Sequence, residues 1–151
     1  MSDLGKIAGR VITDVLEKMA FMFADAAESP LELTEPERAM AAQLEFKGPL
    51  RGTIRVAASD DLCRLLACNI LGVEPDQVSD TLAEDALKEF LNVVSGEFIE
   101  ALAENRPLYE LAVPTAFEMS ADAWRALAAN KAAVGFLVED APLLVFVEVS
   151  E

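Results

Sequence analysis

The segment from Asp85 to Gly96, DALKEFLNVVSG, confines its polar residues to one narrow stripe of a predicted helix. At about 100° of rotation per residue, one face of this helix carries in order Asp85, Glu89, Asn92 and Gly96. The other side of the helix carries the apolar residues Leu82, Ala86, Leu87, Phe90, Val93, Val94, Phe98 and Leu102. The fold must therefore cover a wide apolar face of this helix. A carboxylate and a carboxamide stay outside, one turn apart, as expected of two groups that are inserted into a partner.

The chain before this segment alternates between helical and strand patterns. Residues 4–26 carry apolar side chains at helical spacing and predict a first helix. Residues 40–46 and 50–59 have strand character, and Gly48-Pro49 between them indicates a hairpin turn. The N-terminal part is therefore expected to form a helix followed by a hairpin.

A second helix is predicted over residues 60–71. Either Ser59 or Asp60 can cap its N-terminus, and Gly72 ends it. The helix that carries the polar stripe is expected to follow a short loop.

The long helix is predicted to extend from about 82 to 104. Thr81 with Glu84 forms the pattern of a capping box at its start. Beyond it, residues 108–120 have strand character, but Pro114 favours an edge position or an irregular segment there.

The C-terminal part predicts a short helix and a second hairpin. Residues 121–129 form the helix around Trp124, which is expected to be a buried anchor. Residues 132–139 and 143–150 alternate as strands with a short connection. Short connections between strands imply an antiparallel sheet, so we expect an α+β fold with helices packed on the sheet, in a single domain over residues 1–151.

The charge of the chain excludes several classes of function. Twelve Lys and Arg against 27 Asp and Glu give a net charge of −15, which disfavours binding to nucleic acid or to an anionic membrane surface. Histidine is absent, which excludes Ser-His-Asp and Cys-His nucleophile systems and histidine-containing metal sites. The chain also lacks a P-loop and a GxGxxG turn, so no bound nucleotide is expected.

The remaining composition points to the cytoplasm. No apolar run approaches the roughly 18 residues that span a bilayer, and the N-terminus has no apolar signal core. Cys63 and Cys68 would point to different faces of one helix, so they are expected to be free thiols in a reducing compartment.

The polar stripe limits what chemistry it can perform. The Asn92 carboxamide offers two donors and an acceptor and cannot be a general base, but it can hold a water molecule in line for attack. Glu89 can pair with a cation or move protons, and Gly96 lets a partner backbone approach. Spacing alone does not separate this hypothesis from an ordinary solvated helix face, because Glu and Asn three residues apart also occur by chance.

The segment D85-A-L-K-E89-F-L-N92-V-V-S-G96 resembles the motif of the chemotaxis response-regulator phosphatases of the CheC, CheX and FliY class. That motif is Asp or Ser, three residues, Glu, two residues, Asn, and a proline a little over twenty residues later. Pro114 follows Asn92 after 21 intervening residues. Further similarity extends over residues 16–23, 57–76 and 111–119.

The chain carries one copy of this motif. The first helix, which bears another copy in the CheC type, has Glu17 but Ala20 in place of the required asparagine. A single copy resembles the CheX type, whose members form homodimers with one site per subunit. Glu97 departs from the asparagine that follows the motif glycine in many relatives.

The resemblance implies hydrolysis of the aspartyl phosphate on a CheY-like receiver domain, in chemotaxis or related two-component signalling. Asn92 would enter the receiver's pocket and orient the attacking water. Glu89 would pair with the receiver lysine, Asp85 would be auxiliary, and Gly96 would allow close docking. Mg²⁺ is expected on the receiver, and no metal or other cofactor is expected on this chain.

Three other hypotheses remain open at the level of sequence. The chain could be a non-catalytic module that binds a receiver, or an adaptor of a switch complex on the same fold. A third possibility is an unrelated acid-base hydrolase that uses Glu89 and Asp85, which would require a concave pocket.

Overall fold

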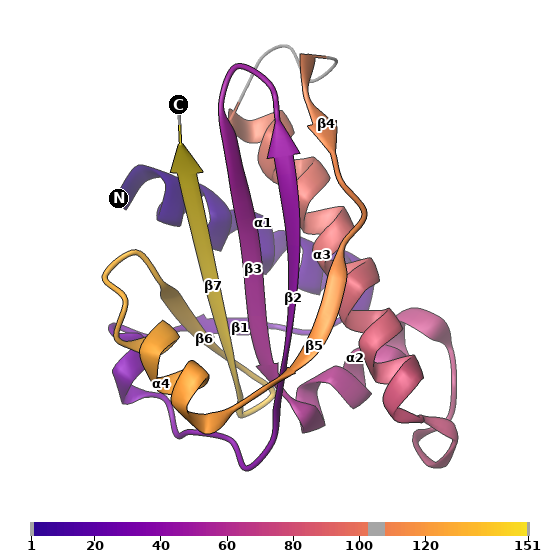
Figure 1. Ribbon diagram of the computed structural model, residues 1–151. Coiled ribbons are helices and arrows are strands. Elements are labelled where there is room, and N and C mark those ends of the chain that lie inside the picture. Colours follow the sequence, from indigo (N-terminus) through magenta and orange to yellow (C-terminus); the bar gives the residue numbers. More distant parts are fainter. Residues whose placement is uncertain (1, 103–107, 151) are drawn as a thin grey trace.

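The computed structural model describes residues 2–102 and 108–150, and its centre is one antiparallel sheet (Figure 1). The seven strands run in the order β1-β6-β7-β3-β2-β4, and β5 pairs with β2 on the same side as β4. The strands are β1 (Ala24–Ala26), β2 (Ala39–Lys47), β3 (Arg51–Ser59), β4 (Glu110–Leu111), β5 (Thr115–Met119), β6 (Val134–Val138) and β7 (Ala141–Ser150).

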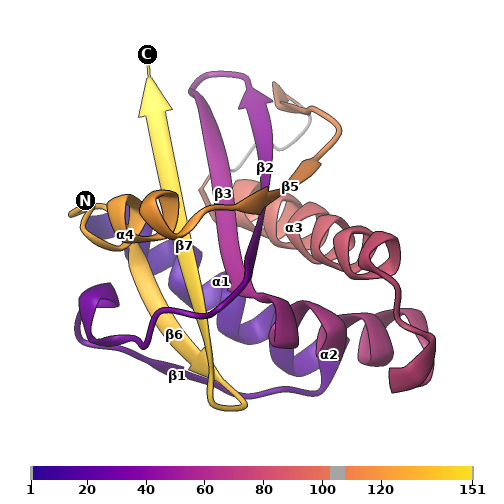
Figure 2. The ribbon, with the colours of Figure 1, turned by 60° about the horizontal axis from the view of Figure 1, so that its bottom comes forward.

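Helices cover both faces of this sheet, but unequally (Figures 1 and 2). One face carries α1 (Ser2–Ala20), α2 (Asp60–Leu71) and α3 (Asp80–Leu102), and the other carries α4 (Ala121–Ala128). Two short 3-10 turns, Pro30–Glu32 and Pro75–Gln77, lie in the connections. The predicted α+β class, with helices on an antiparallel sheet, is confirmed. None of the helices in the described part of the chain combines the length and the apolar character that crossing a bilayer requires.

The two layers follow from the alternation of side chains along the central strands. In β2, Met40 and Leu44 point into the core beneath the three helices, whereas Ala41 packs on the side of α4. Trp124 of α4 is only 2% exposed and anchors that helix, as its sequence context predicts. The sheet is therefore buried on both faces where α4 covers it.

The predicted ends of the second helix are confirmed. Of the two candidate caps, Ser59 takes the role, because its Oγ accepts a hydrogen bond from the Leu62 amide at 3.2 Å. At the other end Gly72 adopts a φ of 72°, which a residue without Cβ reaches at no steric cost. Neighbouring residues in the sequence are therefore sufficient to predict both ends of α2.

The first helix is shorter than predicted, because it ends at Ala20 rather than at residue 26. The carbonyl of Ala20 accepts a hydrogen bond from Asn69 of α2 at 2.7 Å, so a neighbouring helix terminates α1. The backbone turns at Phe21, which has a φ of 57°, and residues 24–26 then pair with β6. A tertiary strand pairing thus overrides the local helical pattern.

The predicted capping box at Thr81 is wrong. The long helix begins two residues earlier, where the Ser79 Oγ accepts from the Leu82 amide at 3.1 Å. The chain is already held there, because Arg64 donates to the Val78 carbonyl at 2.9 Å and also pairs with Asp80. The last two positions of the predicted helix, 103 and 104, lie outside the described residues.

We expect Ser79→Ala to lower the free energy of unfolding by about 1 kcal/mol, because it removes the N-cap of α3. Thr81→Ala is the matched control and is expected to change it by less than about 0.5 kcal/mol, since Thr81 is exposed within the first turn. Urea unfolding followed by circular dichroism measures both. A larger loss of stability from Thr81→Ala than from Ser79→Ala would show that Thr81 is the N-cap, as the sequence predicted.

Candidate active site

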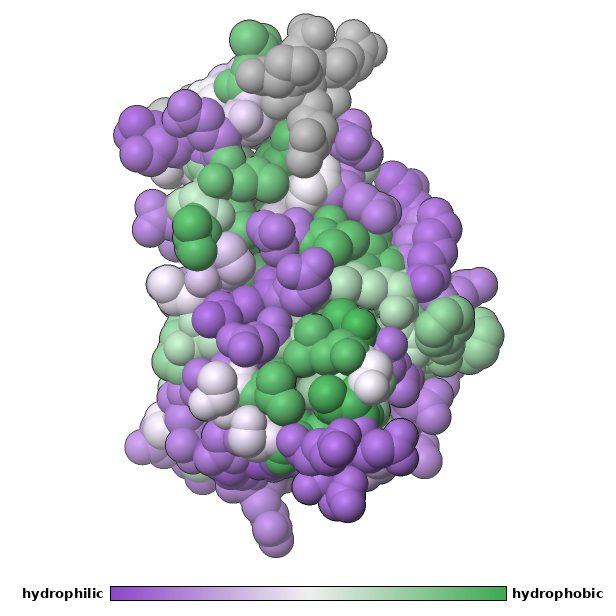
Figure 3. Space-filling model, turned by 90° about the vertical axis from the view of Figure 1, so that its right-hand side faces the viewer, coloured by the Kyte–Doolittle hydropathy of each residue, from purple (hydrophilic) through white to green (hydrophobic). Residues whose placement is uncertain are grey.

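The polar stripe of α3 faces solvent. Asp85, Glu89 and Asn92 are exposed, whereas Phe90 and Val94 on the opposite side are fully buried. Residues one turn apart on a helix have Cβ atoms about 5–6 Å from each other, so the Glu89 carboxylate and the Asn92 carboxamide project side by side. Figure 3 views the molecule from the side of α2, α3 and β5 and shows hydrophilic side chains gathered beside apolar ones on this surface.

A hollow of about 340 Å³ lies beside the stripe. One wall is α3, and the other is the segment that leads into β5, with Val113 and Pro114. Val113 is 85% exposed, so the hollow is open to solvent rather than enclosed. Pro114, which follows Asn92 after 21 intervening residues, is thus brought into the same site by the fold.

The charged groups in the hollow differ in how they are held. The Lys88 ammonium lies 3.6 Å from Oδ1 of Asp85, so these two side chains form an ion pair one turn apart. Within the part of the chain that the structure describes, neither the Glu89 carboxylate nor the Asn92 carboxamide has a hydrogen-bond or ion-pair partner. Both are therefore available to an incoming molecule.

Three of the four residues singled out from the sequence line the hollow, and Gly96 does not. Gly96 is partly buried on the same helix, one turn beyond Asn92, and Glu97 beside it is also partly buried. Lys88 and Val113 are additions that the stripe pattern did not identify as site residues. Lys88 could have been identified from the sequence, because it lies within the motif between Asp85 and Glu89. No sequence pattern, in contrast, predicted that Val113 lies beside α3.

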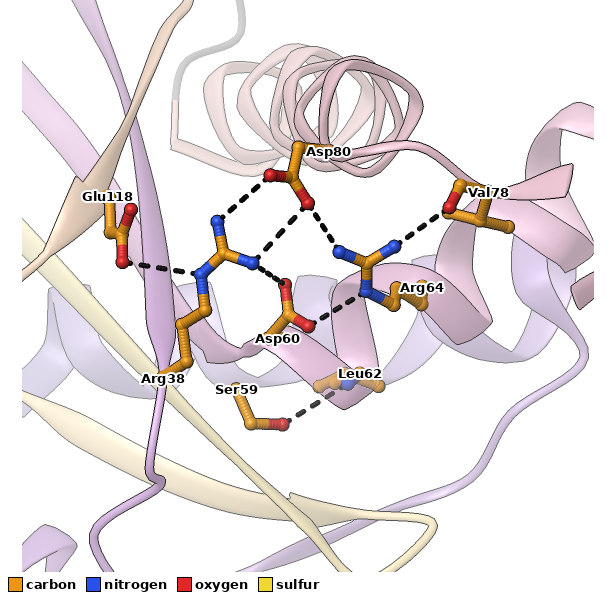
Figure 4. Close-up of polar contacts among 8 residues, drawn as sticks. All are labelled: Arg38, Ser59, Asp60, Leu62, Arg64, Val78, Asp80 and Glu118. Atoms are coloured by element: carbon orange, nitrogen blue, oxygen red, sulfur yellow. Dashed lines mark hydrogen bonds and ion pairs between the residues drawn. The ribbon is translucent and has the colours of Figure 1, made fainter. Parts of the chain in front are cut away.

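An ionic network fixes the N-terminus of α3 against the rest of the fold (Figure 4). Two nitrogens of Arg38, which precedes β2, each donate at 3.3 Å to the carboxylate of Asp80, the first residue of α3. The third nitrogen of Arg38 donates to Glu118 of β5 at 3.2 Å. Arg64 of α2 also pairs with Asp80 and donates to Asp60 at 2.8 Å. The network thus ties α3 to α2 and to β5, the strand that follows the second wall of the hollow.

The network also changes the acidity of Asp80. Hydrogen bonds from Arg38, and next from Arg64, lower the pKa of the Asp80 carboxyl below its usual value. Because the folded state lowers this pKa, the stability that Asp80 contributes is present above the ordinary pKa and is lost as the pH falls through the folded value. The network is therefore expected to weaken in acid.

Arg38→Gln is expected to raise the pKa of Asp80 toward the ordinary value of about 3.9, because it removes the largest cause of the shift. NMR titration of the carboxyl carbon measures this directly. The difference in urea midpoint between the wild type and this variant is expected to shrink as the pH drops below about 4. Lys131→Gln, which removes a positive charge from the connection between α4 and β6, should leave Asp80 unaffected. An unchanged Asp80 pKa in Arg38→Gln would contradict this account.

Other features that could carry chemistry are less suited to it. A larger hollow of about 550 Å³ is lined by one guanidinium, that of Arg38, and by six carboxylates, which would repel an anionic substrate. The six are Glu35, Glu37, Asp60, Asp61, Glu139 and Asp140.

The thiols and carboxylates do not form a second reactive centre. Both cysteines are free, as predicted, and burial raises the pKa of the Cys63 thiol to about 12, so it stays protonated at neutral pH. Among the described residues, no group of three or more Asp, Glu or Cys side chains is placed to hold a metal ion.

The region that forms the hollow matches a known protein family. Residues 40–136 match the family model described as chemotaxis phosphatase CheX. This range is more than half of the chain and includes all of α3 together with Val113 and Pro114. Among curated protein sequences there is no significant match.

Solved structures share the fold over nearly the whole chain. The chemotaxis protein CheX from Desulfovibrio desulfuricans is 19% identical, with a TM-score of 0.69 over 98% of this chain and 99% of that one. CheX from Vibrio vulnificus is 16% identical, with a TM-score of 0.71 over 97% of each chain. CheX from Borrelia burgdorferi, in a complex with CheY, BeF₃ and Mg²⁺, is 13% identical, with a TM-score of 0.66 over 97% of each chain. At these identities the similarity establishes the fold.

Proposed function

The chain belongs to the CheX family of chemotaxis phosphatases, and we propose that it hydrolyses the aspartyl phosphate of a CheY-like receiver domain. The observation that supports this most is the pair of exposed side chains, Glu89 and Asn92, which lie at the edge of an open hollow and have no partner among the described residues. A pair held on a rigid helix can enter the pocket of another protein, whereas a small substrate would need a more enclosed site.

The proposed reaction is the transfer of a phosphoryl group from a carboxylate to water. The water oxygen forms a bond to phosphorus, and the bond between phosphorus and the aspartyl oxygen breaks. The products are a free carboxylate and inorganic phosphate, which retains both protons of the water as H₂PO₄⁻. Such transfers depend mainly on in-line positioning and on charge neutralisation. We propose that the receiver holds the Mg²⁺ for this step and that this chain contributes side chains alone.

The roles of the side chains follow from their chemistry and from the family. Asn92 would orient the attacking water through its amide, which donates and accepts but does not ionise near neutral pH. Glu89 would pair with a lysine of the receiver and hold the complex together. Asp85 would be auxiliary through its ion pair with Lys88. Gly96 would permit close approach of the receiver further along α3.

A relative supports the choice of partner. The Borrelia burgdorferi CheX structure contains CheY together with Mg²⁺, and that protein shares the fold of this chain. A CheY-like receiver is therefore the partner that we propose here.

Asn92→Ala is expected to lower the rate of phosphate release from a phosphorylated receiver by about 100-fold or more, because a preorganised amide is lost. Binding of the receiver should persist in this variant. Glu89→Ala is expected to weaken both binding and turnover, since it removes the ion pair across the interface. Phosphate release in single-turnover and steady-state experiments, together with titration of the receiver, measures these effects.

The matched control is Glu148→Ala, which removes an exposed carboxylate from β7. Its activity should equal that of the wild type. Equal turnover by the wild type, Glu89→Ala and Asn92→Ala would reject the catalytic assignment. Receiver binding by the wild type without any acceleration would favour the receiver-binding or adaptor hypothesis.

We also propose that the protein acts in the cytoplasm as a homodimer with one site per subunit, as the CheX type does. Phe21 and Phe23 are 77% and 67% exposed, so apolar surface is available for self-association. Sedimentation is expected to give a particle of twice the 16.3 kDa of one chain. A mass of 16.3 kDa at all concentrations tested would contradict the dimer.

A further inference from the structure

Lys88 occupies a distinctive position in an acidic protein. The chain carries a net charge of −15, yet the wall of the hollow that bears Glu89 and Asn92 also bears this lysine. Among the described residues that line the hollow, Lys88 is the single cation. The structure therefore places a positive charge directly beside the two groups that would enter a receiver.

The ion pair that holds Lys88 leaves it available to a partner. Its ammonium lies 3.6 Å from the Asp85 carboxylate, and the two side chains are 36% and 49% exposed. Ion pairs between exposed side chains are weak because water screens them. The Asp85 carboxylate therefore does not prevent contact of Lys88 with another anion.

Val113 stands on the opposite wall as an exposed apolar side chain on a restrained backbone. The Ala112 amide donates to the Glu45 carbonyl of β2 at 2.9 Å, and Thr115 already pairs with Gln43. Pro114 further limits the backbone of the residue before it. Because the segment is ordered in advance, contact with Val113 would cost little conformational entropy on binding.

We propose that Lys88 and Val113 are the residues by which this chain docks its phosphorylated receiver, an inference that rests on the proposed function. Lys88 attracts the anionic phosphorylation site, where a phosphoryl group and the carboxylates around it carry negative charge. Because Asp85 and Glu89 also line the hollow, Lys88 does not make it positive, but it offsets part of the repulsion that would slow encounter with an acidic partner. Val113 supplies the apolar contact on the other side, and Glu89 and Asn92 then act between these two anchors.

Reversing the charge at Lys88 tests the electrostatic part. Lys88→Glu is expected to lower kcat/KM for the phosphorylated receiver by about 10-fold at low salt, with kcat within about twofold of the wild type, because docking is affected rather than chemistry. The loss should diminish as ionic strength rises. Lys88→Arg, which keeps the charge, should retain most of the wild-type value.

The matched control is Lys131→Glu, which changes the net charge equally in the connection between α4 and β6, away from the face of the sheet that carries α3 (Figure 1). An equal loss in Lys88→Glu and Lys131→Glu would show that only total charge matters and would overturn the role of Lys88.

Truncating the apolar side chain tests the second anchor. Val113→Ser is expected to raise KM about 5-fold with no dependence on salt, because an apolar contact is lost. Leu31→Ser, at another exposed apolar position, is the control and should have no effect. Equal KM values for Val113→Ser and Leu31→Ser would overturn the role of Val113.

Failure of the proposed function can be distinguished from failure of this inference. If the wild type does not accelerate phosphate release, the affinity for the phosphorylated receiver replaces kcat/KM as the measurement, and the same ranking of variants is expected. An inactive wild type with that ranking rejects the phosphatase but supports the docking residues. Absence of receiver binding by the wild type rejects both.

Discussion

Burial of one face of α3 against the sheet sets the direction of every polar side chain on that helix. Phe90, Val94 and Phe98 are fully buried, and each such side chain stabilises the fold by about 1.5–3 kcal/mol. No rotation of the helix could hide Glu89 and Asn92 without exposing these residues to water. The outward position of the carboxylate and carboxamide is therefore a consequence of core packing and needs no interaction of its own.

The hollow depends on a second constraint, because its other wall belongs to a distant part of the chain. Pairing of β5 with β2 brings Val113 and Pro114 to the edge next to α3. Arg38 then connects the start of α3 with β5 through Asp80 and Glu118. The ridge of α3 alone would be a flat surface, and the packing of β5 beside it creates a concave one.

The proposed site must both attract an acidic partner and position a water molecule, and differently charged residues perform these two tasks. A protein with a net charge of −15 would repel an acidic receiver over most of its surface, yet the hollow contains Lys88. Asp85, which the motif marks only as an auxiliary residue, forms an exposed ion pair with this lysine. Attraction of the partner and positioning of water can thus reside on neighbouring turns of one helix.

Periodicity and local signals in the sequence were sufficient to predict the exposed positions of Asp85, Glu89 and Asn92 on α3, the hairpins, and the limits of α2 with a cap at Ser59 or Asp60 and an end at Gly72. These features depend on interactions within a few residues or on the contrast between polar and apolar faces. Two features were decided by tertiary structure, namely the end of α1 at Ala20 and the position of Val113 beside Asn92. Each depends on a contact with a segment remote in sequence, the Asn69 side chain for the first and strand β2 for the second. The spacing of residues along the chain does not predict such contacts. The free energy that stabilises them comes from elements that meet only after folding.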